Sequence, residues 1–268
     1  MNIIFAALTA TTLYLLCTLG LLLHLRQSTV AKNMSKALLL APGFLALIAH
    51  GFVLYSTMIN PVGINFGFYS SLSLISASIT LLILISSIRH PIEILGIMVM
   101  PVAAAMIILD ILQSSSHIIA TGGSSGLLFH IMSSIIAYSI LGLAAVYAIV
   151  LSIQNSLLHR HQPGGVLRFL PPLKTMESLL FETITIGFAC LSVALISGLI
   201  FLENIFAQHL VHKTALSIFA WIVFGILLFG HWFIGWRGRT AIRWTLGGFF
   251  SLMLAYFGSK FVLEVLLT

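Results

Sequence analysis

Charged side chains are scarce in this sequence. Of its 268 residues, 7% are Asp, Glu, Lys or Arg, whereas 60% are hydrophobic. A soluble globular protein carries about a quarter charged residues. The scarcity excludes a soluble fold and leaves no room for a separate soluble domain. It predicts an all-α integral membrane protein, with a single membrane domain over residues 1–268.

Cysteine and the motifs of soluble enzymes are also nearly absent. Cys17 and Cys190 lie inside apolar runs and form neither C-x-x-C nor C-x-x-C-H, which excludes covalent haem attachment and an obvious redox pair. The sequence has no Ser/His/Asp arrangement, glycine-rich phosphate loop or H-E-x-x-H motif. No two of its six acidic residues form an evident buried pair. We therefore expect no enzyme and no proton-coupled carrier.

Eight apolar stretches are long enough to cross a bilayer, which takes about 20 residues in a helix. Only Arg89-His90-Pro91 separates the third from the fourth, and proline both stops a preceding helix and suits a helix start. The first stretch lacks the positive residues and cleavage site of a signal peptide, so we expect an uncleaved span. The expected spans are approximately 3–24, 37–58, 66–88, 92–112, 127–153, 179–202, 213–234 and 241–265.

Lysine and arginine are distributed unevenly over the connections between these spans. Of the 12, ten lie in the connections that follow odd-numbered spans or within three residues of them, and only Lys213 and Lys260 do not. Because cytoplasmic loops are enriched in Lys and Arg, this pattern predicts both termini on the outer side of the membrane, which for a bacterial inner membrane is the periplasmic side. The formal charge of +6 gives no indication of nucleic-acid binding, because it belongs to these short loops and faces the lipid bilayer surface.

Ten histidines are many for so apolar a sequence. Seven of them lie in expected loops or at the membrane edge, where a solvated imidazole is ordinary. Two of these are three residues apart, but without a third ligand they do not indicate a metal site. The seven are His24, His90, His117, His159, His161, His209 and His212.

The other three histidines, His50, His130 and His231, lie inside expected spans. Burying a polar group without a hydrogen-bond partner costs roughly 2–7 kcal/mol. Two interpretations stay open, namely hydrogen bonds between helices and axial ligation of haem iron. At 1.5 Å per residue, His130 and His231 differ in depth by about 20 Å and cannot share one iron. His50 and His130 match best by depth.

The last two expected spans meet at a tight basic corner, Gly235-Trp236-Arg237-Gly238-Arg239. The guanidinium groups of Arg237 and Arg239 suit lipid headgroups or haem propionates. We prefer headgroups, because tryptophan and arginine together are typical of a membrane interface.

The second half of the chain carries a recognisable order of motifs. FHIMSSIIAYSILGLAAVYAI is followed by LPPLKTMESLLFETITIGFACLSVALISGLIF, then by GHW-x-x-GWRGR at the corner and by AYFGS. With this order, residues 127–264 resemble the cytochrome c assembly membrane proteins of the CcsA, CcmC and HemX kind, in particular their short YpjD-like branch.

This resemblance implies haem handling by non-covalently bound haem b. His130 matches the family's external histidine and His231 its intramembrane histidine, while His50 is a candidate partner on an early span. The loop 203–212 lacks the tryptophan-rich segment with which the family presents haem, which speaks against haem delivery at the outer face. Two alternatives stay open, namely haem bound inside the membrane and a family member that has lost the haem role. The protein would act without turnover, beside other membrane proteins of cytochrome maturation. The alternative is an ancillary subunit of a transporter, for example of divalent metal ions, on the same scaffold.

Overall fold

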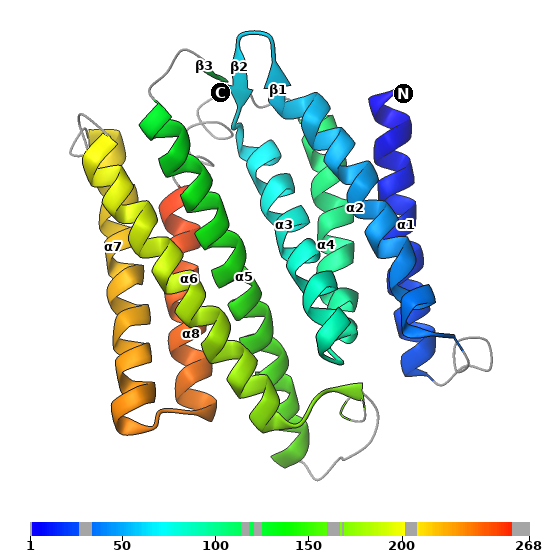
Figure 1. Ribbon diagram of the computed structural model, residues 1–268, viewed down its shortest axis with the longest axis vertical. Helices are drawn as coiled ribbons and strands as arrows, with labels where there is room; N and C mark the ends of the chain where they lie inside the picture. Colours follow the sequence, from blue (N-terminus) through cyan, green and yellow to red (C-terminus); the bar gives the residue numbers. More distant parts are fainter. Residues whose placement is uncertain are drawn as a thin grey trace. The chain divides into compact units, whose positions relative to one another are not determined.

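The fold is built of long α-helices that run alternately up and down (Figure 1). The computed structural model describes residues 2–26, 34–113, 118–120, 125–159, 167, 169–201 and 208–258. In this part of the chain the helices are α1 (Ile3–Leu25), α2 (Lys36–Met58), α3 (Phe68–Arg89), α4 (Gly96–Leu112), α5 (Ser125–His159), α6 (Leu173–Phe201), α7 (Gln208–Phe229) and α8 (Gly238–Met253).

Seven of these helical segments are long and apolar enough to cross a membrane, which confirms the first seven expected spans. Large apolar side chains on their outer faces are exposed, for example Ile48 at 72%, as a helix in lipid requires. The eighth expected span begins with α8 and the π-helical turn η4 (Leu254–Gly258). Residues 259–265 of that span lie outside the described residues, so an eighth crossing stays a prediction.

Local sequence explains where several helices begin and end. Ser35 caps α2, because its hydroxyl accepts a hydrogen bond from the Leu38 amide at 3.3 Å. Pro91 follows the end of α3, and a short 3-10 helix η1 (Glu93–Leu95) leads into α4, as the Arg89-His90-Pro91 break predicts. The facing ends of the fifth and sixth expected spans, 153 and 179, are wrong, since α5 extends to His159 and α6 starts at Leu173.

The helices group into two compact units. Unit 1 contains residues 1–121 and 162–171, and unit 2 contains residues 122–161 and 172–268. In unit 1 each of α1 to α4 packs against the next and α4 returns to α1; in unit 2 α5 to α8 do the same, with α8 against α5. Each unit is thus an antiparallel four-helix arrangement with its own packed interior.

Unit 1 also carries a small antiparallel sheet that the sequence pattern did not reveal. Strands β1 (Ile59–Asn60) and β2 (Gly63–Asn65) form a hairpin, and β3 (Ile118–Ala120) pairs with β2. The expected spans left residues 59–65 and 113–126 only as connections. Strands of two or three residues are too short to show an alternating pattern, and β3 comes from a distant part of the chain.

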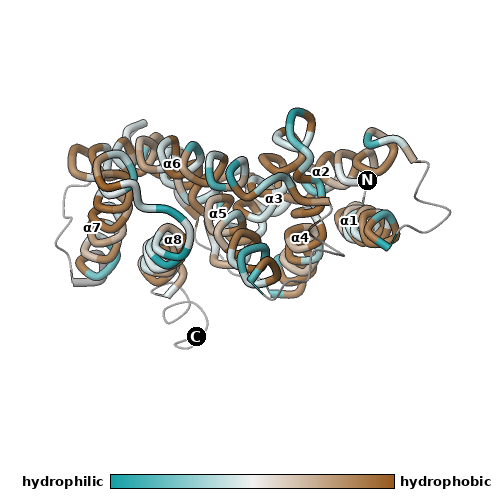
Figure 2. The backbone as a smooth tube through the Cα atoms, turned by 90° about the horizontal axis from the view of Figure 1, so that it is seen from below, coloured by the Kyte–Doolittle hydropathy of each residue, from teal (hydrophilic) through white to brown (hydrophobic). Residues whose placement is uncertain are grey.

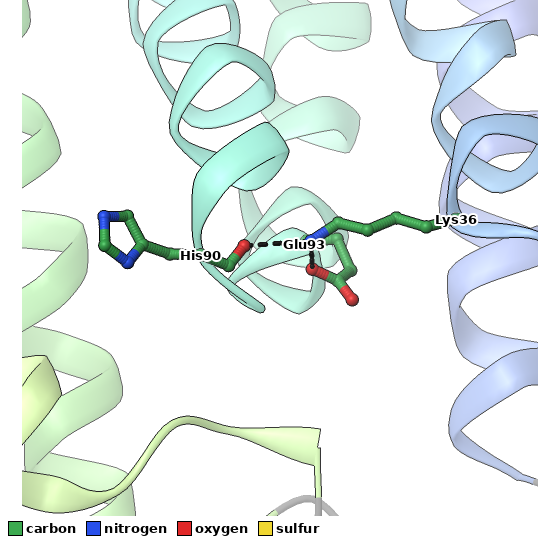
Figure 3. A network of polar contacts seen from close by, with 3 residues as sticks. All are labelled: Lys36, His90 and Glu93. Carbon is green, nitrogen blue, oxygen red and sulfur yellow. Dashed lines mark hydrogen bonds and ion pairs between the residues drawn. The ribbon is translucent and has the colours of Figure 1, made fainter.

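At the opposite end of unit 1, an ion pair joins α2 to the start of α4 (Figure 3). The Lys36 Nζ atom lies 3.0 Å from Glu93 Oε2 and donates a hydrogen bond to the His90 carbonyl oxygen, also at 3.0 Å. Lys36 therefore holds the connection between α3 and α4 against the first turn of α2.

The connection between α7 and α8 in unit 2 is hydrophilic. Figure 2 shows this connection changing from neutral to hydrophilic colours beside helices that are coloured hydrophobic over most of their length. It contains the expected basic corner, Gly235 to Arg239, and it brings the end of α7 close to the start of α6.

Candidate functional site

His50 lies in the interior of unit 1, fully buried, and both of its ring nitrogens have side-chain partners. Its Nδ1 lies 3.2 Å from the Tyr14 hydroxyl and its Nε2 lies 2.9 Å from the Ser73 hydroxyl. The Tyr14 ring also meets the imidazole edge-on, at 5.9 Å between centroids. These contacts connect α1, α2 and α3. They leave no free nitrogen on His50 for a metal.

His130, in the first turns of α5, packs against α6 in unit 2. Its Nδ1 lies 2.9 Å from the Ala194 carbonyl oxygen and 3.2 Å from the Ser197 hydroxyl. A carbonyl oxygen only accepts hydrogen bonds. Nδ1 of His130 therefore carries the proton and donates a hydrogen bond to the Ala194 carbonyl oxygen. Gly198 permits this approach, because a Cβ atom there would lie 2.9 Å from the His130 ring. Nε2 of His130 then holds a lone pair and has no protein partner among the described residues.

His231 lies in unit 2 in the π-helical turn η3 (Gly230–Ile234), which ends α7. Its Nδ1 lies 3.0 Å from the Trp236 carbonyl oxygen, so Nδ1 again carries the proton. Its ring stacks on Phe181 of α6, with centroids 3.5 Å apart and planes 12° from parallel. Stacking covers the face of the imidazole but leaves Nε2 at its edge, where the described residues offer no partner.

Glycine shapes the corner that holds His231. Gly235 has φ +80°, a left-handed conformation that glycine adopts at little cost, and it ends the π-helical turn. The Trp236 amide then donates to the Gly230 carbonyl oxygen at 3.0 Å. A Cβ atom at Gly230 would lie 2.4 Å from the Trp236 ring. The two glycines therefore fold Trp236 back under the turn and aim its carbonyl at His231, and π-helical turns are frequent at functional sites.

A cavity of about 590 Å³ lies beside His231, between α6 and this corner. Its size falls within the range of about 300–1,000 Å³ that is common for small-molecule sites. Glu177 is one of its lining residues, and its Oε1 accepts a hydrogen bond from the Gly238 amide at 2.9 Å, which ties α6 to α8. The lining residues are Lys174, Glu177, Ser178, Phe181, Glu182, Thr185, Ile186, His231, Trp232 and Arg237.

Both histidines of unit 2 lie against the same helix, α6, far apart along it. His231 contacts Phe181 and His130 contacts Ala194, 13 residues further on. At 1.5 Å per residue this corresponds to about 20 Å, which matches the separation predicted from the sequence. The two imidazoles thus belong to separate places. The predicted pairing of His50 with His130 joins residues of different units and stays a prediction.

Sequence reasoning missed the contribution of α6 to the site. It counted Lys174 only among the basic residues that predict the orientation, and it placed no acidic residue in a site. Positions 174, 177, 178, 181, 182, 185 and 186 repeat every three to four residues and therefore share one helix face. That spacing is visible in the sequence, but only the structure shows that the face meets His231. Arg239 does not line the cavity, so the corner's two arginines have different surroundings.

Other polar groups of the described chain do not assemble a metal site. No group of three or more His, Cys, Asp or Glu side chains there is arranged to hold a metal ion. His212 lies in α7, not in the expected loop 203–212; residues 203–207 lie outside the described part. In unit 1, Asp110 is buried and accepts hydrogen bonds from Ser70 at 2.6 Å and Thr57 at 3.1 Å.

Comparison with known proteins identifies the family of this chain. The family model described as cytochrome c assembly protein matches residues 38–267. The inner membrane protein YpjD of Escherichia coli K12 is 30% identical over 233 residues, which cover 83% of this chain and 85% of that protein. No solved structure matches the chain.

Two further relatives are similar over shorter parts. An Azospirillum brasilense protein of 28.8 kDa, from a nifR3-like 5′ region, is 35% identical over 159 residues, or 58% of this chain and 59% of that protein. The cytochrome c biogenesis protein CcsA of Chlamydomonas reinhardtii is 24% identical over 155 residues, or 57% of this chain and 43% of that protein. The chain is thus a multi-pass inner membrane protein that belongs to the cytochrome c assembly protein family.

Proposed function

We propose that this protein binds haem b non-covalently within the membrane and takes part in cytochrome c assembly without enzymatic turnover. Family membership supports the process, and the CcsA relative is named for cytochrome c biogenesis. The bilayer is its environment, and its partners are other membrane proteins of cytochrome maturation.

The observation that carries the proposal is the hydrogen bonding of His231 and His130. A histidine that binds a metal commonly donates its other ring N–H to a carbonyl or carboxylate, which fixes the tautomer and raises the basicity of the ligating nitrogen. Both imidazoles have this arrangement at Nδ1, with Trp236 and Ala194 as acceptors. Each therefore offers a lone pair on Nε2, whereas His50 has both nitrogens occupied.

The surroundings of His231 fit a haem better than a hydrated ion. The cavity provides an aromatic and apolar wall in Phe181, Ile186 and Trp232, which suits a flat macrocycle. Imidazole is a common protein ligand of haem iron. His231 would supply its Nε2 to the iron, Phe181 would keep the imidazole plane fixed, and the Trp236 carbonyl would hold the proton on Nδ1.

The absorption spectrum of the purified protein tests this proposal. Protein from haem-replete membranes should show a Soret band, and His231→Ala should remove it or reduce its intensity and shift its position. His130→Ala should remove any second component. His50→Leu is the matched control, since it removes a buried imidazole that has no free nitrogen. A colourless wild-type protein, or a band that persists unchanged when both His130 and His231 are replaced, would contradict the proposal.

A further inference from the structure

Two cations line the cavity beside His231 without an ion-pair partner. Lys174 and Arg237 share this cavity with Glu177 and Glu182, but within the described chain no nitrogen of either cation lies within ion-pair distance of a carboxylate. The contrast is Lys36 in unit 1, whose Nζ lies 3.0 Å from Glu93 Oε2 (Figure 3). Opposite charges line one cavity and yet do not pair.

The two carboxylates of the cavity are instead bound locally. Glu177 Oε1 accepts from the Gly238 amide at 2.9 Å. Glu182 Oε1 accepts from the Ser178 hydroxyl at 2.9 Å, one turn earlier on the same helix. Both acids therefore have structural roles within the protein. The ammonium group of Lys174 and the guanidinium group of Arg237 remain available to an anion that enters the cavity.

The cavity also changes in polarity along α6. Lys174 and Glu177 belong to its first turns, and the Ser178–Glu182 bond draws the Glu182 carboxylate back toward them. Phe181, Thr185 and Ile186 follow along the helix, and Trp232 joins them from the corner. Positions 174 and 186 are 12 residues apart, or about 18 Å along the helix. A ligand that fits this gradient has an apolar body and anionic groups at one end.

We infer that Lys174 and Arg237 bind the two carboxylates of a flat, apolar dicarboxylate, the haem, whose ring lies toward Phe181 and Ile186. This inference rests on the proposed function and adds the orientation of the ligand and the residues that hold its acidic edge. The guanidinium of Arg237 can bind a carboxylate through two N–H groups, and the Lys174 ammonium can bind the other as a point charge. An anionic lipid headgroup presents similar charge, but it lacks the flat ring and the second carboxylate.

A comparison of haem with its dimethyl ester, in which both carboxylates are esterified, tests whether the cations bind the haem carboxylates. Full-length protein depleted of haem is reconstituted in nanodiscs. It is titrated separately with haem and with the diester, and binding is measured from the Soret band. The wild type should bind haem about tenfold or more tightly than the diester. Lys174→Gln and Arg237→Gln should each weaken haem binding by about tenfold and leave the affinity for the diester unchanged. The band position should not move, because His231 remains in place.

Arg239→Gln is the control, since this exposed arginine lies beside the corner but does not line the cavity. Unfolding temperatures of all variants are compared, and Lys174 and Arg237 are exposed enough that we expect no loss of fold. If wild type binds haem and diester equally, or if the cavity variants bind haem as wild type does, the inference fails while the proposed function stands.

A second series in nanodiscs with and without phosphatidylglycerol identifies a lipid site. Haem affinity that depends on Lys174 and Arg237 in both membranes supports the inference. If replacing Lys174 or Arg237 changes only the stabilisation of the protein by phosphatidylglycerol, the cations bind lipid headgroups and the inference is overturned. If the wild type binds neither haem nor its diester, the proposed function itself fails, and the inference fails with it.

Discussion

The Nε2 atoms of the three intramembrane histidines have different surroundings. In His50 this atom meets the Ser73 hydroxyl at 2.9 Å, whereas in His130 and His231 the described residues leave it free. All three have a partner at Nδ1. An imidazole that joins three helices through both nitrogens contributes to stability. An imidazole whose Nε2 keeps its lone pair without a partner among the described residues can bind a ligand.

Replacing His50 by leucine should therefore affect stability and leave haem binding intact. The change removes the partners of two buried hydroxyls, on Tyr14 and Ser73, and should lower the free energy of unfolding by about 1–3 kcal/mol. Denaturant unfolding in detergent measures the loss. Ser73→Ala should give a smaller decrease, since only one contact is lost. A normal stability with a vanished Soret band would contradict this assignment.

The three candidate histidines could be selected from the sequence, because imidazole inside an apolar stretch is conspicuous. Their different roles could not, since the roles depend on atoms contributed from elsewhere in the chain. Ser73 lies 23 residues beyond His50, and Ala194 lies 64 residues beyond His130. The Trp236 carbonyl is close in sequence to His231 but reaches it only because the chain makes a π-helical turn, which hydropathy does not encode.

A hydrogen bond ties the corner between α7 and α8 to α6. Glu177 Oε1 accepts the Gly238 amide proton at 2.9 Å, where Gly238 has φ +56° at the first residue of α8. A hydrogen bond to a charged acceptor is worth about 1.5–3 kcal/mol. The corner carries Arg237, which lines the cavity, and Trp236, whose carbonyl oxygen accepts the hydrogen bond from His231 Nδ1. This contact therefore orients both groups.

Glu177→Ala should loosen the corner, whereas Glu177→Gln should preserve it in part, because the amide oxygen still accepts. Hydrogen exchange of peptides covering residues 230–240 measures the difference. We expect exchange at the Gly238 amide to be about tenfold faster in Glu177→Ala than in wild type, and an intermediate rate in Glu177→Gln. Both variants lose the same charge, so their comparison isolates the hydrogen bond. Equal rates in all three proteins would show that the contact does not hold the corner.

Helix positions followed from the sequence much more fully than the elements between them. Twenty apolar residues in lipid have few alternatives to a helix, since every backbone polar group must be satisfied within the segment. The Pro91 break was predicted for the same reason. The β1–β2–β3 sheet, the π-helical turn η3 and the shared face of α6 depend on contacts between distant segments. Apolarity alone does not specify those contacts.

The whole molecule consists of two four-helix units, and the distribution of lysine and arginine predicts how they are oriented. Ten of the 12 basic residues lie in the connections after odd-numbered spans or in the helix turns next to these connections. With eight crossings, this places the corner at Arg237 and the start of α6 on the cytoplasmic side. The charged end of the cavity beside His231 would then lie at the cytoplasmic membrane surface, and His130 would lie near the periplasmic one.

Reporter fusions test this orientation. Alkaline phosphatase joined after Thr268 should be active, because it folds in the oxidising periplasm, and after His159 it should be inactive. Green fluorescent protein should give the opposite result at both positions. Fluorescence at Thr268 together with an inactive phosphatase there would mean seven crossings, and would move the C-terminus to the cytoplasmic side.

Chemical rescue of His231 tests the central claim most directly, which is that this imidazole offers Nε2 to haem iron while Trp236 holds its Nδ1 proton. His231→Gly leaves a space beside Phe181 that free imidazole can occupy. We predict that the variant lacks the wild-type Soret band, that imidazole restores it, and that 1-methylimidazole, which has no N–H for the Trp236 carbonyl, restores it less well. A His231→Gly protein that binds haem like wild type without added imidazole would contradict the account.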